Sequence, residues 1–188
     1  MRRRELLVAL VALCVTRLVI AQADTVPLAL QAKLLAKVAK YDKNFESRAR
    51  GLALISVVID KSVTESRVAG QVLHRELEAL ENVGGLPFRV QDVIYSNEGA
   101  LRQHVDTAHV SVVYVTPGMG KAVTSITRAL SGANVLTVSA VPDDVPNGAV
   151  LGFDLVSSQP KLLINLASAL RQNVAFEPQA LKLMKVYR

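Results

Sequence analysis

The sequence predicts an α/β protein: a single three-layer domain whose mainly parallel sheet is flanked by helices. Residues Gly51–Asp60 and Val110–Thr116 are almost continuously apolar, as in strands that are buried on both faces of a parallel sheet. A helical pattern follows the first of these strands at once, which is the order of a βαβ unit. The chain of 188 residues is 51% hydrophobic, which suits one domain with a proper core.

The first 23 residues have the features of a secretory signal peptide. A basic stretch, Arg2–Arg4, precedes the apolar segment Leu6–Val15, and Ala21–Ala23 supplies a small-x-small cleavage site. The apolar segment is too short to span a bilayer. We therefore predict a signal peptide at residues 1–23 and one secreted α/β domain at residues 24–188.

Charge and cysteine content exclude several functions. Residues 1–23 contain four arginines and one glutamate, so the rest of the chain has a net charge of +3 instead of +6. No basic stripe with interleaved aromatic residues follows, which predicts no nucleic-acid partner. The only cysteine, Cys14, lies in the signal peptide. The mature chain is then cysteine-free, without a disulfide, a thiolate nucleophile or a cysteine-based metal site.

An amphipathic helix is predicted before the first strand, over Pro27–Asp42. Its apolar face consists of Leu30, Leu34, Leu35, Val38 and Tyr41. Beside this face runs a basic row of Lys33, Lys37 and Lys40. The row is either an ordinary solvated face or a contact for an acidic partner or anionic lipid.

The strand Gly51–Asp60 is followed by Ser62–Glu65, which has the spacing of a capping box. The helix that this predicts buries a face of Ala69, Leu73, Leu77 and Leu80 and stops before Gly84 and Gly85. Phe88–Tyr95 predicts a second strand that is only partly buried. A short helix, Asn97–Val105, is expected next, with Ser96 as its cap.

The second half of the chain ends in an antiparallel hairpin and two helices. After the strand Val110–Thr116 come a turn, a helix and the strand Asn134–Val141. Two strand-like runs with a short turn between them predict the hairpin, Ala149–Val156 and Lys161–Leu166. The last predicted helices are Ala167–Gln172 and Pro178–Tyr187, the second with proline in its first turn.

Two turns that follow predicted strands are candidate ligand sites. No glycine follows Asp60, so the first strand does not carry a dinucleotide site, and Asp60 is either a turn residue or faces a ligand crevice. The turn Thr116–Lys121 contains Gly118, Gly120 and Lys121 and could offer free amides to an anion. It lacks the glycine spacing and the Ser/Thr of a Walker loop, and the alternative is a plain tight turn.

Catalytic and metal-binding patterns are not found. His74, His104 and His109 have no metal-like partners, no serine lies in G-x-S-x-G, and no carboxylate pair stands out. We therefore predict no metal, no cofactor and no enzymatic activity. An enzyme that uses Asp60 or His74 is the least favoured alternative.

The last third of the chain resembles the closing segments of the YfiR family, which are secreted proteins of Gram-negative bacteria. The resemblance is carried by Asn134–Ala140 (NVLTVSA), Gly148–Phe153 (GAVLGF) and Lys161–Val186. It includes the Leu-Thr-Val-Ser strand, a turn with glycine, the Ile164-Asn165 strand end and a leucine-rich carboxyl terminus.

This resemblance implies a regulator rather than a catalyst. It implies a periplasmic protein that acts on the periplasmic part of an inner-membrane signalling protein, a diguanylate cyclase of cyclic-di-GMP signalling or a sensor kinase, and a homodimer is implied as well. The chain departs from the family in lacking cysteine pairs, so redox sensing by thiols is excluded. It also has Tyr41–Phe45 where the family has an aromatic-Pro signature.

The candidate partner-binding residues are Asn165, at a strand-to-helix junction, and Leu181 and Met184, on the expected terminal helix. For all three, the alternative is a role in capping or core packing. The second functional hypothesis is a small-ligand-binding module that resembles one lobe of a periplasmic binding protein. Its candidate site is the turn with Gly118, Gly120 and Lys121.

Overall fold

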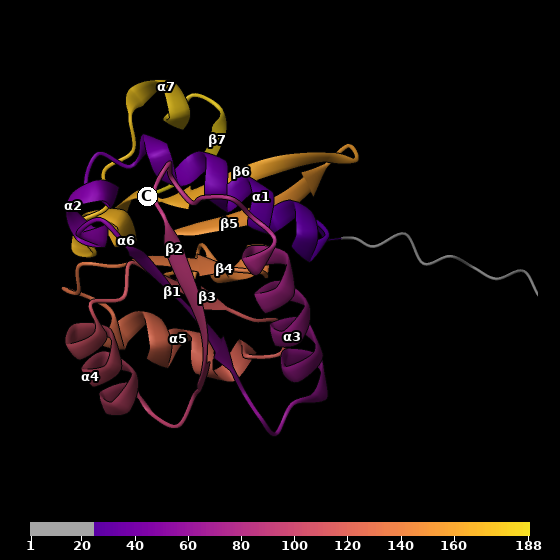
Figure 1. Cartoon of the computed structure of the whole chain (residues 1–188). Helices are drawn as coiled ribbons and strands as arrows, with labels where there is room; N and C mark the ends of the chain where they lie inside the picture. Colours follow the sequence, from indigo (N-terminus) through magenta and orange to yellow (C-terminus); the bar gives the residue numbers. More distant parts are fainter. Residues whose placement is uncertain (1–24) are drawn as a thin grey trace, which may run out of the picture.

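A seven-stranded sheet runs through residues 25–188, the part of the chain that the computed structural model describes (Figure 1). The predicted signal peptide lies outside these residues. The spatial order is β2-β1-β3-β4-β5-β6-β7. The strands are β1 Ala53–Ile59, β2 Phe88–Ile94, β3 Val112–Val115, β4 Leu136–Ser139, β5 Leu151–Val156, β6 Gln159–Asn165 and β7 Met184–Tyr187.

The strands β1 to β5 run parallel to one another. Strands β5 and β6 form the antiparallel hairpin that the sequence predicts. Strand β7 pairs in parallel with β6 and so completes one edge of the sheet. The order 2-1-3-4-5 of the parallel strands is that of a doubly wound sheet. The prediction of an α/β domain with a mainly parallel sheet and a carboxyl-terminal hairpin is therefore confirmed.

Helices cover both faces of the sheet, because successive side chains of a buried strand point to opposite sides. On one face, Ile55 and Val57 of β1 share a core with α1 and α3. On the other face, Val58 packs with the residues of α4 and α5. The α-helices are α1 Leu28–Val38, α2 Phe45–Ala49, α3 Thr64–Glu78, α4 Glu98–Ala108, α5 Gly120–Ala129, α6 Leu166–Arg171 and α7 Pro178–Leu181.

A buried polar contact fixes α1 on the sheet. The hydroxyl of Tyr114, on β3, donates to Oε1 of Gln31, and the Gln31 amide donates to the carbonyl oxygens of Val26 and Ala140. Tyr114 and Gln31 are both buried, and burial raises the pKa of the Tyr114 hydroxyl well above its usual range. The hydroxyl therefore remains a hydrogen-bond donor at physiological pH.

Replacing Tyr114 by phenylalanine should lower the free energy of unfolding by about 1–3 kcal/mol, because the buried Oε1 of Gln31 loses the only donor that it has among residues 25–188. Urea unfolding of the variant measures this loss. The partly buried Tyr41 makes no side-chain hydrogen bond with another described residue, so Tyr41→Phe is the matched control and should change stability by less than about 0.5 kcal/mol. Equal stability of the Tyr114 variant and the wild type would contradict the role of the contact.

A second buried polar cluster joins a segment near the start of the domain to a segment near its carboxyl end. The Asp42 carboxylate accepts hydrogen bonds from Arg48 Nη1 at 2.7 Å and from the Ala175 amide at 2.9 Å. Arg48 also donates from Nη2 to the carbonyl oxygen of Asn173. A β-bridge between Asp42 and Phe176 continues this contact. The segment between α1 and α2 is thereby bound to the segment that follows α6.

Two predicted helix caps are wrong. The capping box at Ser62–Glu65 does not form, because the Ser62 hydroxyl donates to the Asp60 carboxylate, and α3 begins at Thr64 without a side-chain cap. The Ser62 amide bonds to the same carboxylate, so Asp60 is a turn residue. The cap of α4 is Asn97, whose side chain accepts from the Ala100 amide, and not Ser96.

The predicted terminal helix Pro178–Tyr187 is also wrong. Helix α7 ends after one turn at Leu181, and Met184–Tyr187 forms strand β7. Val186 pairs with Ile164 of β6 in this strand. The free edge of β6 satisfies the backbone groups of the last residues, and this tertiary pairing outweighs the helical pattern of their leucines.

Candidate functional site

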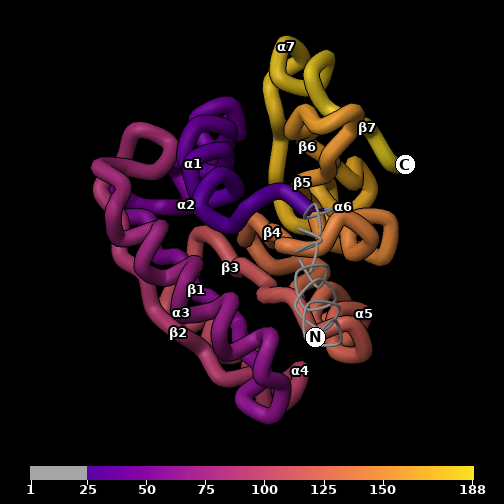
Figure 2. Tube along the Cα trace, turned by 90° about the vertical axis from the view of Figure 1, so that its right-hand side faces the viewer, coloured from indigo at the N-terminus to yellow at the C-terminus, as the bar shows by residue number. Residues whose placement is uncertain are grey.

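An apolar groove lies between α1 and the carboxyl-terminal segment of α7 and β7. Figure 2 shows where these elements lie in the fold. The cavity volume of the groove is about 270 Å³. Helix α1 and Tyr41, in the 3₁₀ turn after it, supply one wall, β6 the floor and the carboxyl-terminal segment the other wall. The lining residues are Leu34, Lys37, Val38, Tyr41, Leu162, Gln179, Ala180, Leu183 and Met184.

The wall from α1 follows from the amphipathic pattern of this helix. Leu35 and Val38 are buried, whereas Leu34 and Tyr41 are only partly buried and border the groove. These residues belong to the apolar face that the sequence predicts for Pro27–Asp42. The helix ends earlier than predicted, at Val38, and a 3₁₀ turn, Ala39–Tyr41, continues its direction. The apolar face is thus divided between the core and the groove.

The opposite wall exposes a large apolar side chain. Leu183 connects α7 to β7 and retains 70% of its accessible surface, while Met184 beside it is 6% exposed. Met184, the first residue of β7, packs in the core, and Leu183 turns outward between the two short elements. A leucine so exposed at the rim of an apolar groove is a typical contact for a binding partner.

Lysines surround one side of this groove. Lys33, Lys37 and Lys40 of the predicted basic row are all exposed, and Lys37 lines the groove itself. The Lys40 ammonium lies 5.0 Å from the centre of the Tyr41 ring, which is a cation–π contact. The groove therefore combines an apolar floor with positive charge along the α1 side. Such a surface complements an apolar segment that carries acidic residues.

Of the predicted carboxyl-terminal site residues, only Met184 lines the groove. Leu181 is partly buried against the core. Asn165 is buried, and its side chain caps α6 by accepting from the Ser168 amide and donates to the carbonyl oxygen of Val145. The sequence pattern did not indicate Leu183, because the predicted terminal helix would have placed it on a different face from Leu181 and Met184.

The predicted turn site lies apart from the groove, after the carboxyl end of β3. Gly120 and Lys121 begin α5 and are exposed. Gly118 has a φ angle of +80°, and a Cβ atom there would lie 2.8 Å from a Val63 methyl group. Only glycine suits this position. The site that the sequence predicts at this turn stays a prediction.

Among residues 25–188, no group of three or more His, Cys, Asp or Glu side chains is arranged to hold a metal ion. His104 hydrogen-bonds to Ser56, at 3.0 Å, and to Gln91, and burial lowers its pKa. Ser56 is completely buried within the sheet. This Ser–His contact therefore joins α4 to β1 and β2, and a substrate has no access to the hydroxyl.

His74 connects α3 to the edge strand β2. Its Nδ1 lies 2.8 Å from the Asp92 carboxylate, and its Nε2 lies 3.3 Å from Glu78. The hydrogen bond with Asp92 is the main cause that raises the pKa of His74 above 6.5. A raised pKa in the folded state means that the charged form stabilises the fold, fully below pH 6.5 and less as the pH rises through that pKa.

We therefore expect wild type to exceed a His74→Gln variant in stability by more at about pH 5.5 than at about pH 8. Urea unfolding at the two pH values measures the two differences. In an Asp92→Asn background, which lacks the main partner of His74, the same substitution is the control and should show a smaller pH effect. The same difference for His74→Gln at both pH values would contradict the charge pairing.

The fold defines a class, the doubly wound α/β domain, and this domain carries an apolar groove beside α1. The chain belongs to the YfiR/HmsC-like family, whose profile matches residues 29–185. The resemblance seen in the sequence is thus confirmed. The family consists of periplasmic proteins that are generally regulatory. In the described residues, none of the helices is long and apolar enough to cross a bilayer.

Solved structures share the fold at low sequence identity. A conserved domain protein from Vibrio cholerae matches with a TM-score of 0.61 at 12% identity, over 86% of this chain and 60% of its own. CD0873, a substrate-binding protein with adhesive properties from Clostridium difficile, gives 0.61 at 13% identity over 88% and 61%. An ABC domain from Streptococcus pneumonia, in complex with L-Trp, gives 0.56 at 12% identity over 80% and 62%.

The chain thus spans about three-fifths of the length of these three structures. At this identity, the likeness shows the fold alone. A search of the curated proteins gave no match.

Proposed function

We propose that this protein is a non-catalytic periplasmic regulator that binds the periplasmic part of an inner-membrane signalling protein, a diguanylate cyclase or a sensor kinase. Membership of the YfiR/HmsC-like family supports the regulatory role. Binding needs no cofactor and no reacting group, which agrees with the structural roles of Asn165, Ser56 and His104 described above.

The observation that carries this proposal is the apolar groove with Leu183 at its rim, 70% exposed. Burying a leucine side chain contributes about 1.5–3 kcal/mol, so a partner that covers Leu183 gains affinity without a change in the fold. The lysines of α1 add electrostatic attraction for acidic residues of the partner, which speeds association and sets orientation.

The proposal is tested by deleting the gene in its native host and measuring cellular cyclic-di-GMP. A photo-crosslinking residue at Gln179, in the groove, should then capture a membrane protein with a periplasmic domain, whereas the same residue at the exposed Arg75 on α3 should not. The proposal fails if cyclic-di-GMP is unchanged and no membrane protein is linked from either position.

A small-ligand-binding module remains the second candidate. It is supported by the likeness to a substrate-binding protein and to an ABC domain in complex with L-Trp. The turn with Gly118, Gly120 and Lys121 lies at the carboxyl ends of parallel strands, where doubly wound sheets bind their ligands. A thermal-shift screen of anions and small metabolites tests it, and this candidate loses its support if no compound raises the melting temperature.

A further inference from the structure

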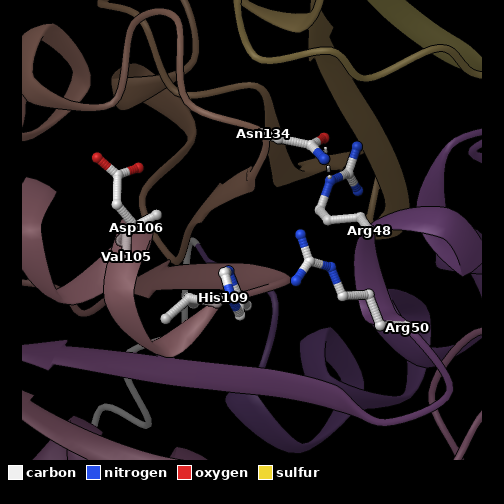
Figure 3. Close-up of a pocket in the computed structure, with 7 residues that line it drawn as sticks. Arg48, Arg50, Val105, Asp106, His109 and Asn134 are labelled. Carbon is white, nitrogen blue, oxygen red and sulfur yellow. Dashed lines mark hydrogen bonds between the residues drawn. The ribbon is translucent and has the colours of Figure 1, made fainter.

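A small polar pocket opens at the other end of the parallel strands, beside the segments that enter β1, β3 and β4 (Figure 3). Its cavity volume is about 130 Å³, which is enough for several water molecules or one small polyatomic ion. Two arginines, a histidine and an asparagine dominate it. The lining residues are Arg48, Arg50, Val105, Asp106, His109, Val110 and Asn134.

Arg48 has more N–H groups than its protein partners use. Its side chain is 1% exposed. The guanidinium donates from Nη1 to Asp42, from Nη2 to the Asn173 carbonyl oxygen and from Nε to Asn134 Oδ1. Every nitrogen of this guanidinium thus has a partner among the described residues. An arginine carries five N–H groups, so Nη1 and Nη2 each keep a second N–H that is free to donate to an acceptor in the pocket.

Arg50 adds a positive charge that no described acid balances. Its guanidinium makes none of the ion pairs of residues 25–188, and Figure 3 shows it directed between Arg48 and His109. Asp106 is the only acid in the lining, and its carboxylate is held by Arg102 at 2.7 Å and points away from the arginines. Two guanidinium groups thus converge on one small space.

The helix ends near the pocket do not cancel this charge. Helix α4 ends at His109, and a helix carboxyl terminus contributes a partial negative charge of about half a unit. The charge of Arg48 is balanced by Asp42, and the helix end offsets the charge of Arg50 only in part, so the pocket remains positive. A group with negative charge and several acceptor oxygens matches this pocket better than water, because guanidinium groups bind carboxylate and phosphate in two-point contacts.

We propose that this pocket binds a small anion through a carboxylate or phosphate group, with Arg50 and the free N–H groups of Arg48 as the donors. The site is distinct from the groove and does not depend on the partner interaction proposed above. It also differs from the Gly118–Lys121 turn, which lies at the opposite ends of the strands. The asparagine and histidine side chains border the anion and limit its size.

The test measures the melting temperature of the purified protein against rising sodium phosphate, sodium acetate and, at the same ionic strength, sodium chloride. Phosphate also stabilises proteins without binding to a site, so the criterion is the difference between wild type and an Arg50→Gln variant. Wild type should show a saturable rise with phosphate or acetate, and Arg50→Gln should require at least about tenfold more anion. The stronger of the two anions identifies the preferred group.

Arg89→Gln is the matched control, since Arg89 is an exposed arginine on β2 and its loss changes the net charge by the same amount. This variant should respond to the anions as the wild type does. Circular dichroism checks that Arg50→Gln, altered at an exposed side chain, keeps the fold. The proposal is overturned if no anion gives a saturable rise beyond chloride, or if Arg50→Gln and Arg89→Gln respond as the wild type does. It is equally overturned if both lose the response together.

Discussion

Replacing Asp42 by alanine is expected to lower the free energy of unfolding by about 3–5 kcal/mol. The Asp42 side chain is completely buried, and the 99% buried guanidinium of Arg48 lies 2.7 Å from it. Removing the carboxylate leaves that buried guanidinium charged without its counter-ion from the protein. It also leaves the amides of Asn44 and Ala175 without their acceptor. In a domain of this size, the melting temperature should fall by roughly 10 °C.

The protein contains a closely matched control for this prediction. Arg102 and Asp106 form an ion pair with the same distance of 2.7 Å, but their side chains are 37% and 53% exposed. Asp106→Ala should therefore cost less than about 1 kcal/mol. Urea unfolding of both variants measures the contrast. Equal losses for Asp42→Ala and Asp106→Ala would show that burial does not set the strength of the inner pair.

Replacing Leu183 by glutamate is expected to abolish regulation while leaving the protein folded. The side chain is 70% exposed, so the unfolding free energy should change by less than about 0.5 kcal/mol. A partner that covers the groove would have to bury the new carboxylate, and affinity should fall by at least about a hundredfold. The measurement is complementation: the variant, supplied to the deletion strain, should fail to restore cyclic-di-GMP to its wild-type level.

Leu170 provides the control for this experiment. It is 83% exposed on α6 and does not line the groove. Leu170→Glu makes the same chemical change on the same protein and should complement the deletion fully. If Leu183→Glu also complements, the groove is not the regulatory surface. If both variants fail while both are folded and exported, the effect of the Leu183 change is not specific to the groove.

Continuous apolar strands made the sheet predictable. Ala53–Ile59, within the predicted run Gly51–Asp60, and Val110–Thr116 are buried almost throughout, and local composition alone indicates this. Helix caps were less predictable, because the Ser62 hydroxyl can either accept a hydrogen bond from an amide of α3 or donate one to a nearby carboxylate. In the fold it donates to Asp60. Strand β7 was missed for a different reason. Its residues become a strand only when the free edge of β6 is in place, and the sequence of Met184–Tyr187 does not contain that edge.

The candidate sites were harder to predict from the sequence than the strands, because tertiary structure brings their residues together. The apolar face of α1 was visible from its periodicity, including Leu34, Val38 and Tyr41, but its partner wall was not. Arg48 and Arg50 form no motif with His109 or Asn134, which are more than fifty residues away in the sequence. Parallel strands bring such residues together because the segments that enter neighbouring strands lie at one end of the sheet.

The Asp42 contact also determines when this protein can complete its folding. The Ala175 amide that bonds to the Asp42 carboxylate lies 133 residues further along the chain. Asp42 and Arg48 lie close in the sequence and can pair early in synthesis, but the contact of Asp42 with Ala175 and that of Arg48 with Asn173 form only when almost the whole chain has been made. Contacts between such distant residues slow folding, because a long loop must close before they form. A nascent chain that stays open until its carboxyl terminus emerges remains available to chaperones and, if it is exported, to the machinery that threads it through a membrane.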